Sequence, residues 1–473
     1  MKFLIPLMLA FSSPIPESGS VSSANASYDG NALVLKGQVI LDHGLGKMEA
    51  EEAVLQRQEM GKDFPFSLIH LKKEVLLSLK NNASLKCETA DLDFLSLKGT
   101  LLSSDQVVYT DAFKKKKGAS TIFRLMSKSF KLQLSKKETS DQKSVFDVDT
   151  ILATEGIQID YAEAFMLLAD HAIYRKSEID PRKTEFQSHV SAYPKDSSTP
   201  CHLIHGLDKI DAERVDFDLV HTKVSLLHPR GVIQSLLIPE IPHQSLNFSA
   251  ESLLWDHLKN TLILKGNIAL HEPSWGTLIS ENELQLVQKE KQITSIKTKG
   301  KTSLQYLNAH QLICFGTMNL DRDKLQGTAD SPLIQGVVPE GQQIFYQEGE
   351  IGVFADKAQI EYSAQRTSFQ PVLISLKGHV KISSQDGQCL GVADRVTYSP
   401  TTRTFILGAD PGKRILFINH EENLRLTAQE VHMTEDPTTK KQTVKGIGNV
   451  QLALTPEEEA FIEKLFKLNS PIP

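Results

Sequence analysis

The sequence predicts an all-β protein of stacked antiparallel strand repeats with a short C-terminal helix. Three observations support this prediction. An apolar strand pattern with Lys-Gly at its centre recurs along the chain, and a second pattern, Ala followed by an acidic residue, recurs between its copies. Patterns typical of long amphipathic helices are missing until the C-terminal end. Repetition at a fixed period of this kind is typical of arrays in which each unit buries its face against the next.

The first repeated pattern reads LVLKGQVIL at 33–41, LILKGNIAL at 262–270 and ISLKGHVKI at 374–382, with fainter copies around Gly99 and Gly446. Side chains alternate along a strand, so the apolar residues and the glycine share one face while the lysine lies on the other. A glycine inside a strand permits a bend or a close approach of another backbone. We therefore expect splayed sheets with an apolar groove, lined by Leu33, Leu35, Val39, Leu41, Leu262, Leu264, Ile268, Leu270, Ile374, Leu376, Val380 and Ile382. An ordinary dry sandwich core is the alternative interpretation of the same residues.

The second pattern is a short strand that carries Ala before an acid. Neighbouring copies lie mostly 35 to 43 residues apart, and several lead into a Lys-Gly strand. Because the acid recurs from repeat to repeat, we interpret it as structural and not as a catalytic carboxylate. The copies are Ala50-Glu51, Ala90-Asp91, Ala169-Asp170, Ala212-Glu213, Ala250-Glu251, Ala355-Asp356 and Ala393-Asp394, with Ala428-Gln429 as a variant.

The C-terminal segment TPEEEAFIEKLF predicts a helix. Thr455 is placed as N-cap, Pro456 as the first helical residue and Glu458 as the partner in a capping box. Ala460, Phe461, Leu465 and Phe466 form an apolar stripe, so we expect the helix to cover the end of the sheet.

The chain has 473 residues, 40% hydrophobic and 23% charged, with a formal net charge of −6. This composition is sufficient for two to four domains with substantial cores. The mild negative charge gives no electrostatic reason to expect nucleic acid as a partner. The isolated basic run Lys114–Lys117 is interpreted as a solvated loop, with contact to anionic lipid or polymer as the alternative.

Residues 1–26 are typical of a signal peptide. The apolar run from Phe3 to Phe11 is too short for a membrane-spanning helix, which needs about 20 residues. Ala24-Asn25-Ala26 has the form of a cleavage site, and cleavage nearer 13–20 is the alternative. We expect a first β-roll at 27–228 that is divergent in its second half, a Pro-rich linker at 229–244, a second β-roll at 245–454, and a C-terminal helix and tail at 455–473.

No catalytic or metal-binding motif stands out. Cys87, Cys201, Cys314 and Cys389 lack Cys-x-x-Cys spacing, which leaves two disulfides in three pairings or four free thiols as alternatives. In CHLIH, His202 and His205 fall on opposite faces of a strand, which makes joint metal binding awkward. Trp255 and Trp275 flank the second Lys-Gly strand and are interpreted as core or rim aromatics. We expect no enzymatic activity, no cofactor and no metal.

The repeats at 28–55 and 360–407 resemble the OstA-like family of lipopolysaccharide-transport proteins, which includes the bridge protein LptA, the periplasmic part of LptC and the N-terminal domain of LptD. The hallmark is a Gly-x-Val strand, a loop, and an Ala-acid strand that ends near an aromatic residue. Gly37/Val39, Gly266/Ile268, Gly378/Val380 and the Ala-acid pairs match it. The resemblance covers about 27–120 and 245–454 and is weak in between.

The resemblance implies a twisted β-jellyroll whose apolar interior holds the acyl chains of lipopolysaccharide or a related glycolipid. It also implies edge-to-edge strand pairing with other Lpt-type rolls, with self-stacking as a further option, and a periplasmic location associated with the outer membrane. An apolar groove suits this task because each buried methylene contributes about 0.8 kcal/mol without directional contacts. A structural or adhesive exported β-repeat protein without lipid is the alternative.

Overall fold

The computed structural model describes residues 20–57, 66–114, 120–138, 144–162, 165–180, 185–196, 199–234, 245–273, 276–289, 292–306, 310–365, 368–436, 438 and 442–467. These residues form 37 strands, which pair antiparallel, and one helix. The predicted all-β fold of stacked antiparallel repeats with a C-terminal helix is therefore confirmed. The chain divides into two compact units, unit 1 at Met1–Val224 and unit 2 at Ser225–Pro473, and the division falls within strand β15 (Lys223–Leu227).

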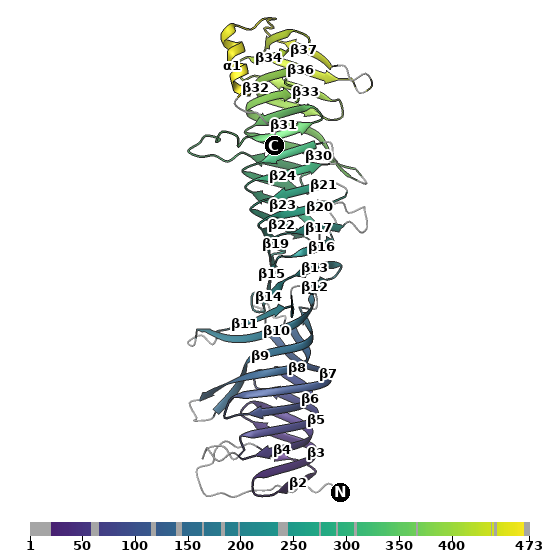
Figure 1. Cartoon of the computed structure of the whole chain (residues 1–473), viewed down its shortest axis with the longest axis vertical. Coiled ribbons are helices and arrows are strands. Elements are labelled where there is room, and N and C mark those ends of the chain that lie inside the picture. Colours follow the sequence, from purple (N-terminus) through teal and green to yellow (C-terminus); the bar gives the residue numbers. More distant parts are fainter. Residues whose placement is uncertain are drawn as a thin grey trace. The chain divides into compact units, whose positions relative to one another are not determined.

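Unit 1 is a meander of long strands, drawn in purple and blue in Figure 1. From β3 to β10 each strand pairs with the next, and β10 then pairs with β11 along one half and with β12 along the other. The strands are β1 (Val21–Ser22), β2 (Asn25–Tyr28), β3 (Ala32–His43), β4 (Gly46–Gln56), β5 (Leu68–Leu79), β6 (Ser84–Asp93), β7 (Lys98–Lys114), β8 (Ser120–Glu138), β9 (Ser144–Tyr161), β10 (Phe165–Asp180), β11 (Glu185–Tyr193), β12 (Cys201–His205), β13 (Asp208–Ala212) and β14 (Arg214–Asp218).

The long strands of unit 1 are interrupted at matching places. The register shifts between Lys36 and Val39 in β3, and again where β4, β5, β6 and β7 pair with their neighbours. A register shift bends a strand. Because the shifts stack from strand to strand, each strand is bent at one common line and its two halves belong to two different walls.

Unit 2 repeats this plan with shorter strands that mostly end at the bend. They are β16 (Arg230–Gln234), β17 (Ser245–Ser249), β18 (Ser252–Asp256), β19 (Thr261–Lys265), β20 (Ile268–Glu272), β21 (Gly276–Ser280), β22 (Glu283–Lys289), β23 (Gln292–Lys299), β24 (Thr302–Tyr306), β25 (His310–Cys314), β26 (Thr317–Asp321), β27 (Gln326–Asp330), β28 (Ile344–Glu348), β29 (Ile351–Ala355), β30 (Lys357–Gln365), β31 (Ser368–Ser384), β32 (Cys389–Ser399), β33 (Thr404–Gly408), β34 (Ile415–Asn419), β35 (Leu424–Ala428), β36 (Glu430–Glu435) and β37 (Gln442–Ile447).

The strand pairings of unit 2 define two walls. Wall A runs through β16, β17, β20, β21, β24, β25, β28, β29, the C-terminal half of β31, the N-terminal half of β32, β34 and β35. Wall B runs through β18, β19, β22, β23, β26, β27, β30, the other halves of β31 and β32, β33, β36 and β37. The chain crosses between the walls at one edge, which we call the corner. The opposite edge, which we call the mouth, carries the hairpin turns of each wall.

Gly266 and Gly378 show what the Lys-Gly pattern does, because each lies at the corner. Gly266 and Asn267 have φ of 70° and 44°, and Gly378 and His379 have φ of 82° and 44°. Two consecutive residues in the left-handed region turn the chain from one wall to the other, and glycine adopts this conformation without steric cost. The inward alternation is kept across the turn. The other corner pairs of this kind are Gly37-Gln38, Lys73-Glu74, Glu155-Gly156 and Gly448-Asn449.

The Ala-acid pattern also lies at the corner, in the strand beside the glycine. Ala250-Glu251 links β17 to β18, Ala355-Asp356 links β29 to β30, and the backbone N–H of Asp356 donates to the carbonyl of Gly378 at 3.1 Å. The acid side chain then meets the residue after the glycine: Asn267 donates to Glu251 at 2.6 Å, and His379 pairs with Asp356 at 2.6 Å. These contacts fit the interpretation of the acids as structural.

Three copies of the patterns lie in strands as expected, but not at the corner. Gly99 is paired inside β7, whose register shift falls between Leu102 and Val107. Gly446 is paired with Val431, and the corner pair is Gly448-Asn449 instead. Ala90-Asp91 lies inside the paired part of β6, where the shift falls between Lys86 and Thr89. The position of the bend is set by the pairing register with the neighbouring strands. The local sequence pattern alone does not determine it.

Helix α1 (Pro456–Lys467) begins as predicted. The N–H of Thr455 donates to the Glu458 carboxylate at 2.8 Å, and the N–H of Glu458 donates to the Thr455 hydroxyl at 3.2 Å. The predicted apolar stripe is right at Phe466, which packs against the sheet, and wrong at Phe461, which is 51% exposed while its neighbour Ile462 is fully buried. Ile462 packs with Leu390 and Ile418, joined by Val392, Leu416, Leu454 and Phe466. The helix therefore covers strands β32 and β34, near the end of the sheet as expected.

The structure describes the predicted signal peptide and the predicted linker only in part. Of the predicted signal peptide, 1–19 lie outside the described residues, and Val21–Ser22 and Asn25–Tyr28 pair with β3 as strands. Cleavage after Ala26 would therefore divide β2. Of the predicted linker, Arg230–Gln234 forms strand β16, paired with β17, and 235–244 lie outside the described residues. Lys115–Lys117 and Trp275 also lie outside them.

Candidate functional site

The twelve predicted groove residues all lie on the inward faces of the strands, but they do not line an open trough. Leu33 is half-buried, and the other eleven are at most 3% exposed. Leu262 and Leu264 lie on wall B, and Ile268 and Leu270 continue the same face on wall A beyond the corner. Apolar side chains therefore fill the interior at these positions. Trp255 is likewise a core residue, 1% exposed.

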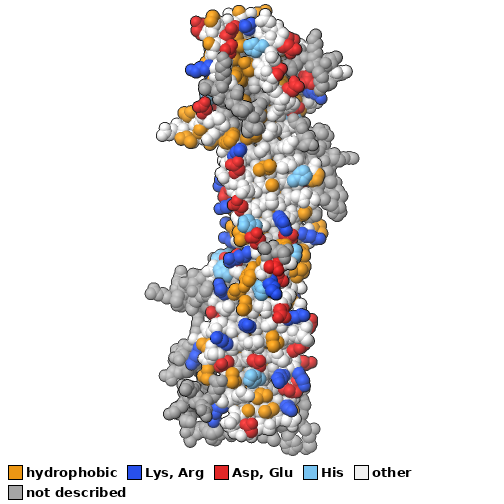
Figure 2. Space-filling model, viewed as in Figure 1, with side chains coloured by type: hydrophobic (Ala, Val, Ile, Leu, Met, Phe, Trp, Pro, Cys, Tyr) orange, Lys and Arg blue, Asp and Glu red, His pale blue; other side chains and the backbone are white. Residues whose placement is uncertain are grey.

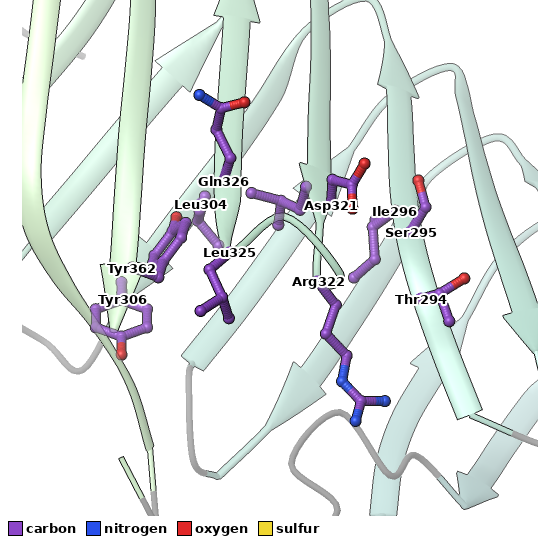
Figure 3. A pocket seen from close by; sticks show the side chains of 11 residues that line it. Thr294, Ser295, Ile296, Leu304, Tyr306, Asp321, Arg322, Leu325, Gln326 and Tyr362 are labelled. Atoms are coloured by element: carbon purple, nitrogen blue, oxygen red, sulfur yellow. The ribbon is translucent and has the colours of Figure 1, made fainter. Parts of the chain in front are cut away.

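A cavity is present elsewhere in unit 2, at the mouth. It provides about 70 Å³ in which the centre of a water-sized sphere can move. Figure 3 shows its walls: Tyr306 and Tyr362 lie on one side and Arg322 and Thr294 on the other. Its lining residues are Thr294, Ser295, Ile296, Leu304, Tyr306, Leu320, Asp321, Arg322, Leu325, Gln326 and Tyr362. Leu304 and Tyr306 come from wall A and the others from wall B or its hairpin turn, so the cavity lies between the walls.

A second, smaller cavity of about 20 Å³ adjoins the first. Both are lined by Leu304, Tyr306 and Tyr362, and the second extends towards Leu312, Ile360 and Ile374. Ile374 is the one predicted groove residue that lines either cavity. Protein interiors contain few voids larger than a water molecule. Two adjoining voids between the walls therefore mark a place in unit 2 where packing is incomplete.

The hairpin turn between β26 and β27 forms the wall-B rim of the cavity. The N–H of Arg322 donates to the carbonyl of Thr294 at 2.9 Å, and the N–H of Tyr362 donates to the carbonyl of Leu325 at 2.9 Å. These bonds hold the turn against the strands on either side. The Asp321 carboxylate is occupied by Lys324, whose ammonium lies 3.1 Å away and whose N–H also donates to it. Partial burial lowers the pKa of Arg322 below its usual value.

Tyr306 forms the wall-A rim. Tyr306 is only 7% exposed, and its hydroxyl has no hydrogen-bond partner among the described residues. Burial, assisted by the charge of Glu272, raises the pKa of Tyr306 to about 12, so the hydroxyl stays protonated at neutral pH. The ring lies 6.5 Å from that of Tyr362 in wall B, measured between ring centroids. The two tyrosines thus meet across the mouth.

Next to the cavities, a polar cluster closes the mouth; we call it the mouth latch. The hydroxyl of Tyr398, from the wall-B half of β32, donates to Glu348 of wall A at 3.0 Å, and Tyr346 donates to the same carboxylate at 3.2 Å. His310 hydrogen-bonds to Tyr346 at 2.8 Å and pairs with Glu348. Burial, followed by the charge of Glu348, raises the pKa of Tyr346 and of Tyr398. The latch therefore joins the walls through side chains, not through backbone pairing.

No catalytic constellation is formed by the residues considered from the sequence. His202 pairs with Asp211 at 2.7 Å and His205 with Asp208 at 3.2 Å, so the two histidines have separate partners. Across the described ranges, no three or more His, Cys, Asp or Glu side chains are grouped to hold a metal ion. All four cysteines are free and buried: Cys87, Cys201, Cys314 and Cys389. Of the two alternatives left by their spacing, the structure therefore has four free thiols.

The sequence did not mark the cavity residues. Arg322 lies in a turn, and neither Tyr306 nor Tyr362 belongs to the twelve apolar positions predicted to line the groove. The signal that was available is the aromatic residue at or next to the end of an apolar strand, at Tyr306 and again at Tyr398. On the face shown in Figure 2, acidic and basic side chains are interspersed along the described surface.

In the described part of the chain, no helix combines the length and the apolar character needed to cross a bilayer. A comparison with protein-family models finds no match, and a comparison with curated proteins finds none either.

Proposed function

We propose that the protein is a non-enzymatic acyl-chain carrier of the cell envelope, and that its cargo is lipopolysaccharide or a related glycolipid. The acyl chains enter between the walls through the mouth, and the sugar headgroup stays outside. The proposal extends to the periplasm as the location, for which the support is the N-terminal apolar run and the resemblance of the repeats.

The observation that carries this proposal is the way the two walls of unit 2 are joined. Backbone hydrogen bonds run along each wall, and the chain crosses between them at the corner, for example at Gly266 and Gly378. At the mouth the walls meet through side chains, and there the adjoining cavities lie. Separating the walls at the mouth therefore breaks side-chain contacts and leaves both sheets intact.

The energetics allow such an exchange. Opening the walls exposes apolar side chains, and an inserted acyl chain covers them again. Ten buried methylenes contribute about 8 kcal/mol of transfer free energy. The chain needs no directional contacts, which suits an interior lined by residues such as Leu264, Leu304 and Leu376.

Site-specific photocrosslinking tests the proposal. We place a photoreactive amino acid at Leu264 or Leu376, which face inward, and at Lys265 or Lys377, the exposed neighbours on the same strands. In cells that make lipopolysaccharide, the inward positions should label it and the outward positions should not. Mass spectrometry of gently extracted protein should show bound acyl lipid. Absence of both signals, or equal labelling from Leu264 and Lys265, would refute the proposal.

A structural β-repeat protein with a dry core is the second candidate. The observation that favours it is the closed interior, since eleven of the twelve predicted groove residues are at most 3% exposed. It predicts that a fluorescent lipid neither binds nor is displaced by glycolipid, and that the protein assembles or attaches to surfaces without lipid. A lipid-displacement titration of the full chain separates the two candidates.

A further inference from the structure

We propose that the connection between β27 and β28, which we call the corner hairpin (331–343), is a membrane-contact element. Its apolar tip inserts shallowly into the interface of a zwitterionic lipid bilayer. The proposal concerns the surface on which unit 2 docks and not what lies between its walls, so it goes beyond the proposed cargo and is tested by separate measurements.

The corner hairpin is longer than the fold requires. Between β17 and β30 the other crossings at the corner take one or two residues, as at Gly266-Asn267 between β19 and β20. From Asp330 of β27 to Ile344 of β28 the chain instead uses the 13 residues 331–343. Figure 1 shows them as a green loop that projects from the side of unit 2. Crossing between the walls therefore does not account for the length of this connection.

The base of the hairpin is fixed to the corner. The N–H of Ser331 donates to the carbonyl of Asp356 at 2.9 Å, and the side-chain amide of Gln343 donates to the Asp356 carboxylate at 2.9 Å. The N–H of Ile344 donates to the Ser331 hydroxyl at 3.1 Å. Both ends of the insertion are therefore held at Asp356, and the residues between them form a defined projection.

The tip of the hairpin is a tight turn that exposes apolar side chains. The N–H of Ile334 donates to the carbonyl of Val337 at 2.9 Å, and the N–H of Val337 donates to the carbonyl of Ile334 at 3.0 Å. Gln335 and Gly336 between them have φ of 51° and 82°, as in a type I′ turn. Leu333, Ile334 and Val337 are 63%, 63% and 68% exposed. The turn is closed by its own backbone bonds, and these three side chains are held out in solvent.

The size and composition of the tip favour a bilayer over a protein partner. A stable protein–protein interface takes about 20 to 30 residues on each side, whereas the tip offers three exposed apolar side chains on a projection (Figure 2). The segment 331–343 contains no Trp, Tyr or Arg, the residues that carry most of the binding energy in protein interfaces. A bilayer interface accepts a small apolar projection without a complementary pocket.

The charges around the tip specify the lipid. Residues 331–339 carry no charge, and the residues that flank them in sequence are the acids Asp330 and Glu340. The tip therefore lacks the basic side chains through which proteins bind anionic lipid. The amide of Gln335 and the backbone of the turn are polar, which confines the tip to the hydrated interface. We expect shallow binding to zwitterionic lipid that anionic lipid does not strengthen.

An environment-sensitive fluorophore attached to Ile334→Cys in the full chain tests the insertion. The four native cysteines are buried, so the label goes to the introduced thiol. Phosphatidylcholine vesicles should shift the emission to the blue, and quenchers near the lipid headgroup should act more strongly than quenchers deep in the acyl region. Leu258→Cys is the matched control, because Leu258 is 61% exposed in the turn between β18 and β19. Equal shifts at the two positions, or none at Ile334→Cys, would overturn the proposal.

A charge at the tip should abolish most of the binding. Val337→Asp should weaken flotation with phosphatidylcholine vesicles about tenfold, and Leu258→Asp should leave it unchanged. Both sites are exposed, so the thermal midpoints of the two variants should match that of the original protein. Vesicles that contain phosphatidylglycerol should bind no more tightly than phosphatidylcholine alone. Unchanged flotation of Val337→Asp, or flotation that requires phosphatidylglycerol, would contradict a neutral bilayer as the partner.

Sedimentation of the full chain without lipid tests a second copy as the occupant. A dimer that Val337→Asp dissociates, in a protein that does not float with vesicles, would assign the tip to self-association and refute membrane contact. The cargo is tested separately, by crosslinking from Leu264 between the walls. Failure of that crosslinking would leave vesicle binding through Val337 in place, whereas loss of vesicle binding would leave the crosslinking result untouched.

Discussion

The Asp356 carboxylate lies where a side chain on Gly378 would have to stand. A Cβ built on Gly378 would come within 2.6 Å of Asp356 Oδ2 and 3.0 Å of Asp356 Cβ. The same carboxylate binds His379 at 2.6 Å and the side-chain amide of Gln343 at 2.9 Å. The acid and the glycine of the two repeated patterns therefore form one unit, in which the acid spans the corner and the glycine makes room for it.

Gly378→Ala should destabilise the protein by roughly 2 to 4 kcal/mol, through the left-handed backbone and the displacement of Asp356. Gly387→Ala is the control, since Gly387 has a φ of 70° but nothing within 4 Å of its Cβ position. It should cost only about 1 kcal/mol. The free energies of unfolding in denaturant measure both. Equal losses would show that the corner contact contributes nothing beyond the backbone conformation.

Much of the fold follows from the local pattern. The inward faces of the three clear Lys-Gly strands are predicted correctly, because alternation along a strand depends only on neighbouring residues. The bend at Gly37, Gly266 and Gly378 was implied by glycine on the apolar face. The copies at Gly99 and Ala90 lie within straight parts of their strands, because the bend of a long strand lies where its partners bend and pairing register is set by residues distant in sequence.

The candidate site was not predictable in the same way. Whether an apolar face lines an open groove or a closed core depends on the side chains of the opposite wall, which no single strand reveals. Leu264 is inward as predicted and fully buried, whereas Leu320, in a weaker repeat, lines a cavity. The cavity depends on Tyr306 of wall A and Arg322 of wall B, which line it from opposite sides only after the walls are assembled.

His43 should make unit 1 sensitive to mild acid. Burial, and to a smaller extent the charge of Lys80, lowers the pKa of His43 from 6.5 to about 4, and its ring lies 4.1 Å from that of Phe94 between centroids. The unfolded chain therefore takes up a proton between pH 6.5 and 4 that the folded chain does not. Stability is fully present above pH 6.5 and falls towards pH 4, by up to about 3 kcal/mol.

His43→Phe should remove this part of the acid sensitivity while keeping the ring contact. His420→Phe, at an exposed histidine, is the control and should leave the slope unchanged. Denaturant unfolding at several pH values between 4 and 7 gives the slopes. If the free energy of unfolding fell equally with pH in the original protein and in His43→Phe, the acid sensitivity would not come from His43.

The four cysteines should be unreactive in the folded protein. Burial raises the pKa of Cys87, Cys201 and Cys389 to about 12, so almost no thiolate is present at pH 8. A colorimetric disulfide reagent should detect close to no thiol in native, unreduced protein and four in denaturant. Fewer than four after unfolding without reductant would reveal a disulfide.

Helix α1 should be held by Ile462. The residue is fully buried against Leu390 and Ile418, so Ile462→Ala should cost about 2 to 4 kcal/mol and detach the helix locally. Phe461→Ala, beside it and 51% exposed, should change the free energy by less than about 0.5 kcal/mol. Limited proteolysis near the C-terminus reports the detachment. Equal resistance of the two variants to proteolysis would show that the contact of Ile462 with the sheet does not hold the helix.

The mouth latch should control access to the interior. Glu348→Ala removes the acceptor of two buried tyrosine hydroxyls, those of Tyr346 and Tyr398, at a cost of roughly 2 to 5 kcal/mol, and leaves Tyr346 with His310 as its remaining partner. Because the bond from Tyr398 to Glu348 joins wall B to wall A, part of that loss should appear as opening at the mouth. We expect faster uptake of an apolar fluorescent dye.

Glu348→Gln retains one acceptor oxygen. Its stability and its rate of dye uptake should lie between those of the original protein and those of Glu348→Ala. Glu350→Ala is the matched control, since Glu350 is an exposed acid in the same hairpin turn. Stopped-flow measurement of dye uptake, together with hydrogen exchange of β28 and β32, separates opening from global unfolding. Opening at the mouth should speed amide exchange at Glu348 and Tyr398 and leave the corner at Gly378 protected. Uniform acceleration at both edges would mean that the latch stabilises the whole roll and does not gate it.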